Sequence, residues 1–470
     1  MLIIAMNTAK GSITEFIDGY AESHMTRLHM PGHKGRAVLG IGDGLNAMFE
    51  RDITEIEGAD ALYSADGIIR ESEKRMAAVY DTAGTYYSAG GSSQCIKAMC
   101  CLAVRDIDSP IIVAGRNAHI SFIHAAGLLG FGISWLEGGE SLCECNVTPE
   151  ILSAHLNRLK EEGKAERVAA IMVTSPDYLG NMLDIRGLAE VAHDFGCLLL
   201  TDNAHGAYLA MLKGNRHPIN LGADMTADSA HKTLPVLTGG SMLHISKTAP
   251  GYLPEDVKQA MLLFGSTSPS YLIMESMDRI LPYLEEQKAC LAETGDNDYE
   301  ACARKVKRFT EELTGSGWTV TGDECLKLTV KVPGRGEKLS QKLRSRGIEC
   351  EFADRDFLVM MWSPANPEED YEKVSRAFAE LKDEFTDSAE VSGPGIGYKL
   401  PEVKCSCREV IFSGYETVDT DMSCGRIAAE AAAKCPPAIL PVVPGEVIDE
   451  DIIKILKYYG IKKIKVIKRP

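Results

Sequence analysis

A lysine in the segment ADSAHKTLPV, from Ala227 to Val236, is the first residue whose position suggests chemistry. An apolar run follows Lys232, whereas a surface lysine usually has charged neighbours. A lysine that enters an apolar environment loses hydration, its pKa falls toward neutrality, and its amine can then attack a carbonyl. The alternative is a lysine that extends from a loop into solvent. Other motifs have to discriminate between these two interpretations.

Three further motifs lie where apolar strands are expected to end. Asp202 closes the run LLLTD, SAGGSSQCIKAM from Ser88 places glycines and hydroxyls before a helix, and His119 follows the strand PIIVAG. Each has a structural explanation: an N-cap or ion pair, a tight turn, and a structural histidine. Their functional interpretations are a carboxylate against a heterocyclic nitrogen, a phosphate on a helix N-terminus, and a catalytic histidine. The glycine segment is no Walker loop, because the Lys-Ser/Thr ending is absent.

Together these motifs match the requirements of pyridoxal 5'-phosphate. That cofactor needs an amine for its aldehyde, an acid for its ring nitrogen and a helix N-terminus for its phosphate. Lys232 lies thirty positions after Asp202 (232 minus 202). The combination favours the interpretation of Lys232 as a Schiff-base lysine.

Composition restricts the class of protein. The 470 residues are 45% hydrophobic and 25% charged, as in globular proteins, and the net charge of -17 argues against nucleic acid as a partner. The cysteine pairs Cys143/Cys145 and Cys405/Cys407 lack further ligands at zinc-finger spacing, so we expect no metal site and reduced thiols. No signal peptide and no membrane span are predicted, and we expect a cytoplasmic protein with no membrane partner.

The order of elements predicts an α/β fold with a mostly parallel sheet. Buried-type strands (PIIVAG, VAAIMVTSP from Val168, CLLLTDNAH from Cys197) alternate with helices such as that from Asp184 to Gly196. A smaller α+β pattern begins near Tyr299, and the linker TDSAEVSGPGIGYKLP opens a C-terminal segment that ends in a basic strand. We therefore predict an N-terminal arm (1–40), a cofactor-binding large domain (41–290), a small α+β domain (291–388) and a C-terminal domain (389–470).

These motifs give the chain a resemblance to one family. HMPGHKG, DITEIEGAD from Asp52, AGRNAHIS, TDNAHGAY, SAHKTLP, STSPSY from Ser266 and the PGE of the tail are similar to motifs of the Orn/Lys/Arg decarboxylases in their shorter form. Those enzymes have the aminotransferase-like fold type I, and the resemblance covers essentially the whole chain. It implies an internal cofactor bond at Lys232, a partner of the ring nitrogen in Asp202 and a stacking residue in His119.

The resemblance implies further contacts to the cofactor. It places Gly91, Ser92, Ser93, Ser229 and His231 around the phosphate, and it adds His205 to the cofactor-binding residues. His231 or Lys232 would return a proton to the substrate. The resemblance also implies a homodimer or higher homo-oligomer with sites at the subunit interface, where Thr267 and Ser268 reach the neighbouring chain's cofactor.

The sequence departs from the family pattern at three places. Asn203 follows Asp202 where an acidic residue is common, Thr238-Gly239 replaces Thr-Gln, and Cys435-Pro436-Pro437-Ala438-Ile439-Leu440 replaces Tyr-Pro-Pro-Gly-Ile-Pro. These changes bear on substrate identity more than on reaction class. A cationic substrate needs an anionic counterpart, for which Glu446 and Glu55 are candidates, and His33 and Lys34 are candidate cross-subunit residues. All four have structural alternatives.

The predicted activity is the decarboxylation of arginine, lysine or ornithine to agmatine or a diamine and carbon dioxide, as in polyamine biosynthesis. The sequence does not discriminate among the three substrates, although the short-form resemblance favours arginine. One alternative is another pyridoxal phosphate reaction, transamination or β-elimination, for which Arg344 or Arg346 would hold the substrate carboxylate. Another is a non-catalytic member of the family that serves assembly or partner binding.

Overall fold

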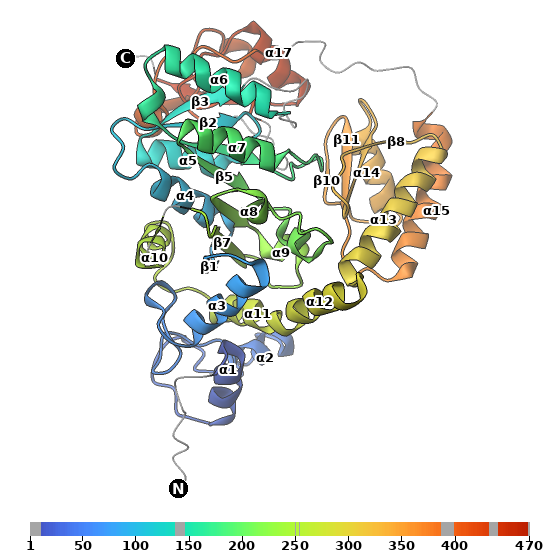
Figure 1. Cartoon of the computed structure of the whole chain (residues 1–470). Coiled ribbons are helices and arrows are strands. Elements are labelled where there is room, and N and C mark those ends of the chain that lie inside the picture. Colours follow the sequence, from blue (N-terminus) through green and yellow to red (C-terminus); the bar gives the residue numbers. More distant parts are fainter. Residues whose placement is uncertain are drawn as a thin grey trace. The chain divides into compact units, whose positions relative to one another are not determined.

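The computed structural model describes residues 11–136, 146–249, 251–252, 254–386, 399–431 and 440–468. The chain forms two compact units (Figure 1): the first is Met1–Leu102 with Gly206–Asn297, and the second is Ala103–His205 with Asp298–Pro470. This division does not test the predicted domain boundaries, which stay a prediction. Cys143 and Cys145, most of the predicted linker (387–398) and most of the altered tail motif (435–439) lie outside the described residues.

Three strands form the sheet portion of the first unit. β7 (Ser241–Ile245) pairs with both β1 (Gly84–Ser88) and β6 (Met225–Asp228), and it is antiparallel to each. β1 and β6 therefore run in the same direction, and their carboxyl ends lie at the same edge. The helices of this unit are α1 (Ile13–Glu22), α2 (Asp43–Phe49), η1 (Leu62–Ser64), α3 (Ile68–Tyr80), α4 (Ser92–Ala103), η3 (Ala207–Met211), α8 (Pro218–Leu221), α9 (Ala230–Thr233), α10 (Pro254–Leu262), α11 (Tyr271–Arg279) and α12 (Leu281–Thr294).

The second unit contains four parallel strands in the order β5-β4-β2-β3. Their bounds are β2 (Ile111–Gly115), β3 (Gly132–Leu136), β4 (Val168–Thr174) and β5 (Leu198–Asp202). Every residue of β2 is buried, as expected for a strand with helices on its faces. The three predicted strands are thus found, and the predicted α/β class with a mostly parallel sheet is confirmed.

Helices connect these strands, and their ends follow the predicted signals. They are α5 (Ile120–Leu129), α6 (Pro149–Glu161), η2 (Ala165–Arg167) and α7 (Ile185–Phe195). The Asp184 side chain accepts the Gly187 N–H at 3.1 Å and caps α7, which ends at Gly196 with φ 83°. Glycine suits that position because other residues are strained in the left-handed region.

A separate antiparallel sheet in the second unit has the order β10-β11-β9-β8. Helices α13 and α15 pack side by side next to it (Figure 1), in agreement with the predicted α+β pattern. The elements are α13 (Asp298–Gly315), β8 (Thr319–Thr321), β9 (Lys327–Lys331), α14 (Gly336–Arg344), β10 (Phe352–Ala353), β11 (Phe357–Met361) and α15 (Glu368–Phe385).

The C-terminal segment belongs to the second unit and shares a core with this sheet. Phe357 and Val359 of β11 pack in one buried cluster with Ile452, Leu456 and other apolar residues of the segment. Its elements are α16 (Cys407–Ile411), β12 (Tyr415–Asp419), η4 (Thr420–Met422), α17 (Glu450–Tyr458) and β13 (Lys463–Ile467), the predicted basic strand. The segment is therefore an integral part of the second unit.

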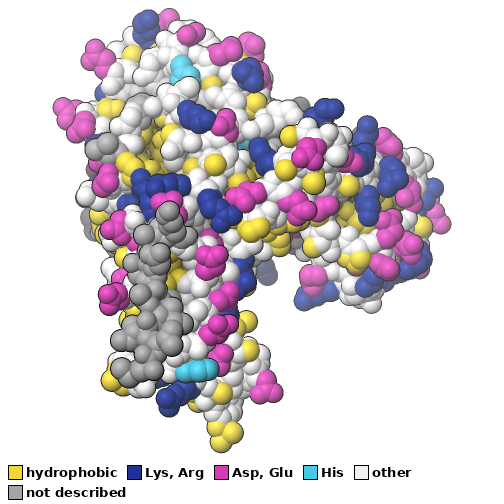
Figure 2. Space-filling view, turned by 60° about the horizontal axis from the view of Figure 1, so that its bottom comes forward, with side chains coloured by type: hydrophobic (Ala, Val, Ile, Leu, Met, Phe, Trp, Pro, Cys, Tyr) yellow, Lys and Arg dark blue, Asp and Glu magenta, His cyan; other side chains and the backbone are white. Residues whose placement is uncertain are grey.

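The surface mixes charges of both signs. On the face shown in Figure 2, Lys and Arg side chains are interspersed with Asp and Glu and form no continuous basic stripe. Such a stripe is typical of nucleic-acid binding. Among the described residues, no helix combines the length and the apolar character that a membrane crossing requires.

Candidate active site

Lys232 lies on α9, a single helical turn directly after β6. Its N–H donates to the Ser229 carbonyl at 3.0 Å, and the Leu234 N–H donates to the Ala230 carbonyl at 2.8 Å. Thr233 and Leu234 are buried, but Lys232 is exposed. The expectation of an apolar environment is therefore wrong for the described part of this chain, because successive side chains of one helical turn point in different directions.

The glycine and serine segment meets the start of this turn. Gly91 has φ 72°, its N–H donates to the Gly239 carbonyl at 3.0 Å, and α4 begins at the next residue. The Ser229 hydroxyl donates to the Ser92 hydroxyl at 2.8 Å. The structure thus brings the predicted phosphate residues of β1 and β6 together at the N-terminus of α4, with Ser93 next in the helix.

His231 is held in one orientation by Gly240. Both its backbone N–H (3.1 Å) and its Nδ1 (2.9 Å) contact the Gly240 carbonyl. Because a carbonyl only accepts hydrogen bonds, Nδ1 carries a proton. In the neutral ring, Nε2 then holds the lone pair that can accept a proton.

Asp202 and His119 lie at strand ends of the second unit. Asp202 is the last residue of β5, is buried, and accepts the Ala204 N–H at 3.1 Å. His119 follows β2 and caps α5, because its Nδ1 accepts the Ser121 N–H at 3.2 Å. The proton of the neutral His119 ring therefore lies on Nε2. β2, β4 and β5 are parallel, so both residues lie at the same edge of the sheet.

His205 is also in the second unit, three residues after Asp202. It is buried, and the Tyr178 ring lies edge-on to it, with the two ring centroids 5.1 Å apart. Such a contact fixes the plane of the imidazole.

The remaining predicted residues of the first unit are dispersed. His33 stacks on Phe49 with ring centroids 4.2 Å apart, and its Nε2 is 3.2 Å from an oxygen of Asp52. Lys34 has φ 57° and donates from Nζ to the His29 carbonyl at 2.5 Å. Both side chains are thus bound to residues of the N-terminal part of the chain, between His29 and Asp52.

Glu55, Thr267 and Ser268 are exposed. The carboxylate of Glu55 is close enough to Tyr63 to contribute, after burial, to a raised pKa of that phenol. The Tyr63 hydroxyl in turn accepts a hydrogen bond from Gln94 of α4 at 2.9 Å.

The structure places Glu446 in a buried ion pair. Its two carboxylate oxygens accept from the two terminal nitrogens of Arg116, each at 2.7 Å, and the side chains are 1% and 4% exposed. Sequence reasoning did not assign Arg116, although it lies in the motif AGRNAHIS. The available signal was a charged residue directly after a wholly apolar strand, where burial requires a partner.

Comparison with known proteins shows the family to which this chain belongs. Residues 13–314 match the family description "Orn/Lys/Arg decarboxylase, major domain". The chain belongs to the Orn/Lys/Arg decarboxylase family. It is therefore a pyridoxal phosphate-dependent amino-acid decarboxylase.

Relatives of this decarboxylase cover nearly the whole chain. It is 27% identical to an arginine decarboxylase of Bacillus subtilis (strain 168), over 92% of this chain and 90% of that protein. It is 24% identical to an arginine decarboxylase of Bacillus anthracis, over 93% of this chain and 90% of that protein. A lysine decarboxylase structure from Francisella novicida superposes with a TM-score of 0.78 and 17% identity, covering 97% of this chain and 81% of that one.

The first unit of the decarboxylase fits a phosphorylated cofactor chemically. The hydroxyls of Ser92 and Ser229 meet at the N-terminus of a twelve-residue helix whose second residue is Ser93 and whose first turn has no acidic residue. The positive end of a helix dipole and its backbone N–H groups stabilise an anion there. Gly91 is required for the turn, since its φ of 72° strains other residues.

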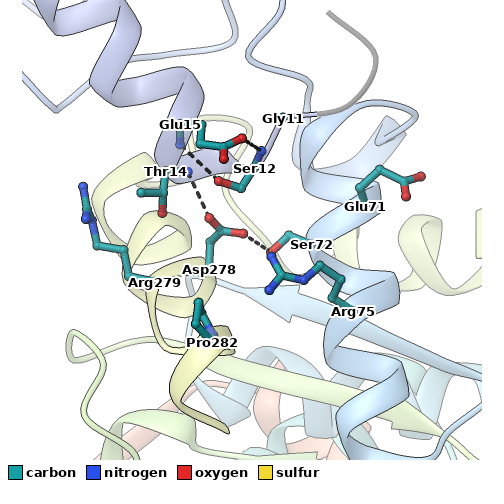
Figure 3. Close-up of a pocket in the computed structure, with 10 residues that line it drawn as sticks. All are labelled: Gly11, Ser12, Thr14, Glu15, Glu71, Ser72, Arg75, Asp278, Arg279 and Pro282. Carbon is teal, nitrogen blue, oxygen red and sulfur yellow. Dashed lines mark hydrogen bonds between the residues drawn. The ribbon is translucent and has the colours of Figure 1, made fainter. Parts of the chain in front are cut away.

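A cavity of about 720 Å³ lies elsewhere in the first unit of the decarboxylase. Figure 3 shows Asp278 at its centre, where it accepts from the Ser72 hydroxyl at 2.7 Å and the Thr14 N–H at 3.0 Å. The arginines of its lining are paired, Arg75 with Glu285 and Arg279 with Glu275 and Asp18. None of the predicted site residues lines it, and its charges compensate one another. We therefore assign the active site to the strand ends.

His217, Asp228 and His244 form a buried group at β6 and β7, with Asp228 the last residue of β6. His217 Nδ1 accepts the Ile219 N–H at 3.3 Å, so its Nε2–H donates to Asp228 at 2.7 Å. A metal-bound histidine instead uses its second nitrogen as a donor. The geometry thus indicates a hydrogen-bonded network that fixes Asp228, the residue directly before Ser229.

This network makes the stability of the decarboxylase depend on pH. Burial lowers the pKa of His244 below 6.5, although the Asp228 carboxylate opposes the shift. His244 therefore binds a proton less tightly in the folded state than in the unfolded chain. The contribution of His244 to stability is complete above about pH 6.5 and is lost as the pH falls below it.

We expect the free energy of unfolding to fall between pH 6.5 and pH 5, by up to about 1.4 kcal/mol per pH unit for one proton. His244→Asn should reduce this slope by up to one proton, measured by urea denaturation at several pH values. His24→Asn is the matched control, because His24 is exposed and its φ of 52° suits asparagine. An unchanged slope in His244→Asn would show that His244 does not titrate as described.

Proposed function

We propose that this decarboxylase removes the α-carboxylate of a basic L-amino acid and releases carbon dioxide with agmatine or a diamine. The observation that carries the proposal is the family match combined with relatives named arginine decarboxylase that align over more than nine tenths of the chain. Those relatives favour arginine over lysine and ornithine. A cytoplasmic location and a place in polyamine biosynthesis stay predictions.

The proposed cofactor residues follow the geometry of each unit. Bound pyridoxal phosphate supplies an aldehyde that captures the substrate amine and a ring that accepts electrons. The hydroxyls of Ser92, Ser93 and Ser229 bind the phosphate at the N-terminus of α4, with Gly91 shaping the turn. Lys232 supplies the amine that holds the cofactor. Its side chain is exposed, on the single helical turn that begins one residue after Ser229.

The second unit supplies two groups in this proposal. Asp202 holds a proton on the ring nitrogen through its carboxylate, which the rigid end of β5 and the Ala204 N–H orient. His119 stacks on the cofactor ring in this proposal. Its imidazole is held at Nδ1 by the Ser121 N–H at the start of α5. His205, held by Tyr178, is the remaining proposed contact in this unit.

Proton return to the substrate Cα requires a group that carries a proton at that step and can be protonated again afterwards. We propose His231 or Lys232 for this step. Nδ1 of His231 is bound to Gly240, so Nε2 is the atom that accepts and donates the proton. The amine Nζ of Lys232 is the second atom that can carry it.

The substrate's cationic side chain needs an anionic partner, and Glu55 is the better proposal. Glu55 is exposed, whereas both oxygens of Glu446 are bound to Arg116. His33 and Lys34 remain proposed cross-subunit residues. The net charge of -17 also favours the approach of a cation.

A homodimer is proposed from the exposed apolar surface of residues 25–48. Helix α2 buries no residue, and large apolar side chains are exposed before it and on it: Met25, Leu28, Met30, Val38, Leu39, Ile41, Leu45 and Met48. Exposed apolar clusters of this kind mark protein interfaces. Thr267 and Ser268, which are also exposed, are proposed to contact the partner's cofactor.

The alternative activities receive no support from the small sheet. Arg344 and Arg346, the candidates for gripping a substrate carboxylate, form surface ion pairs with Glu349 and Glu380, each at 3.0 Å. An arginine that is already paired at the surface is not positioned to bind a substrate carboxylate. Decarboxylation remains the proposed reaction.

Incubation of the purified protein and cofactor with arginine, lysine and ornithine tests the reaction. We expect stoichiometric carbon dioxide and amine from at least one of them, with arginine the fastest. Keto acid, or amine without carbon dioxide, would contradict decarboxylation. The same assay with Lys232→Ala should give neither product.

Asp202→Asn tests the proposed ring partner. Loss of a hydrogen bond to a charged group, about 1.5–3 kcal/mol, should lower kcat about 10- to 150-fold. Asp184→Asn is the control, because Asp184 is an exposed helix cap and asparagine caps equally well. Equal kcat values for the two variants would contradict the proposed role of Asp202 as partner of the ring nitrogen.

A further inference from the structure

The C-terminal segment is joined to the β2–α5 loop by one buried ion pair. Arg116 follows β2 directly, and Glu446 belongs to the PGE motif, 330 positions later. The contact is bidentate, with Nη1–Oε1 and Nη2–Oε2 distances of 2.7 Å. Bidentate arginine–carboxylate pairs fix orientation as well as distance. The pair therefore sets the position of the loop relative to the segment.

Additional contacts hold both partners of this pair. Arg116 Nε donates to the Leu440 carbonyl at 3.2 Å, and its guanidinium lies 4.7 Å from the centroid of the Trp135 ring. Glu446 also accepts the Val443 N–H at 2.8 Å. A buried charge is tolerated only when it is satisfied in this way. These contacts fix the geometry of the pair. Removal of either charge would leave the other buried without a partner.

A second attachment lies at the far end of the same α5 helix. Arg408 of α16 donates to the Leu128 carbonyl at 2.7 Å. A Cβ at Gly127 would be 2.0 Å from Cδ1 of Ile411, so the helices approach closely only because this residue is glycine. The C-terminal segment thus holds α5 at its end and the preceding loop at its start. His119, the cap of α5, lies between these two attachments.

We propose that Arg116 and Glu446 are positioning residues that fix His119 through the β2–α5 loop. This inference rests on the proposed contact of His119 with the cofactor. It replaces the role of substrate counterion that the sequence suggested for Glu446. The C-terminal segment then controls the rate of the reaction through the orientation of one imidazole.

Steady-state kinetics separate the two roles of Glu446. If Glu446 positions His119, Glu446→Gln should lower kcat about tenfold or more, because small misplacements at a reacting centre are that costly. KM for the cationic substrate should stay within about twofold, since no substrate contact is lost. The visible circular dichroism of the bound cofactor should also change, because it reports the surroundings of the ring. A raised KM with unchanged kcat and dichroism would overturn the proposal.

A second variant guards against simple misfolding. Arg116→Met with Glu446→Met leaves no stranded charge, and such replacements of buried pairs are often neutral for stability. We expect this double variant to melt close to the wild type and to keep the reduced kcat. Wild-type kcat in the double variant would overturn the proposal. Glu285→Gln is the control, since it breaks the bidentate but exposed Arg75–Glu285 pair.

Coupling to His119 is the decisive test. Glu446→Gln should add little to the loss of kcat in His119→Ala, because residues that act through one another are non-additive. Fully additive losses would overturn the proposal. Hydrogen exchange of residues 116–122 in the protein without added cofactor tests positioning independently of catalysis. Faster exchange there in Glu446→Gln than in Glu285→Gln is expected, and equal exchange would overturn it. A fully active His119→Ala would instead refute the proposed role of His119.

Discussion

The direction of the strands is the constraint on which the candidate site depends. In the first unit β1 and β6 both run against β7, so Ser92 and Ser229 meet and share a hydrogen bond. In the second unit β2 and β5 run parallel, so His119 and Asp202 lie at one edge. The buried interior of a strand excludes hydrated polar groups, and the residues that can do chemistry therefore collect where the strands end.

Backbone groups in the turns at these strand ends orient the side chains of the candidate site. Gly240 binds His231 through two hydrogen bonds, and the Ser121 N–H binds His119. Each imidazole thus has one nitrogen committed to the backbone and a defined tautomer. At the end of β6, His217 and His244 contact the carboxylate of Asp228, the residue directly before Ser229. Contacts to the backbone thus orient both candidate histidines.

Sequence reasoning predicted the elements well because their signals are local. The apolar runs gave β2, β4 and β5 nearly residue by residue, and Asp184 and Gly196 bound α7 as expected. It failed where contacts are long-range. The exposure of Lys232 depends on the orientation of one short helical turn, and the pairing of Arg116 with Glu446 joins residues 330 positions apart. No periodicity in the sequence predicts either feature. The position of Arg116 directly after a buried strand indicates only that its charge needs a buried partner.

Covalent attachment of the cofactor at Lys232 is the central claim of this account. Borohydride reduction of the protein with bound pyridoxal phosphate, followed by peptide mapping, tests it most directly. The account predicts that the label lies on the peptide containing Lys232 and is absent from Lys232→Ala. Label on another lysine, such as Lys97 of α4, or an unchanged yield in Lys232→Ala, would contradict it.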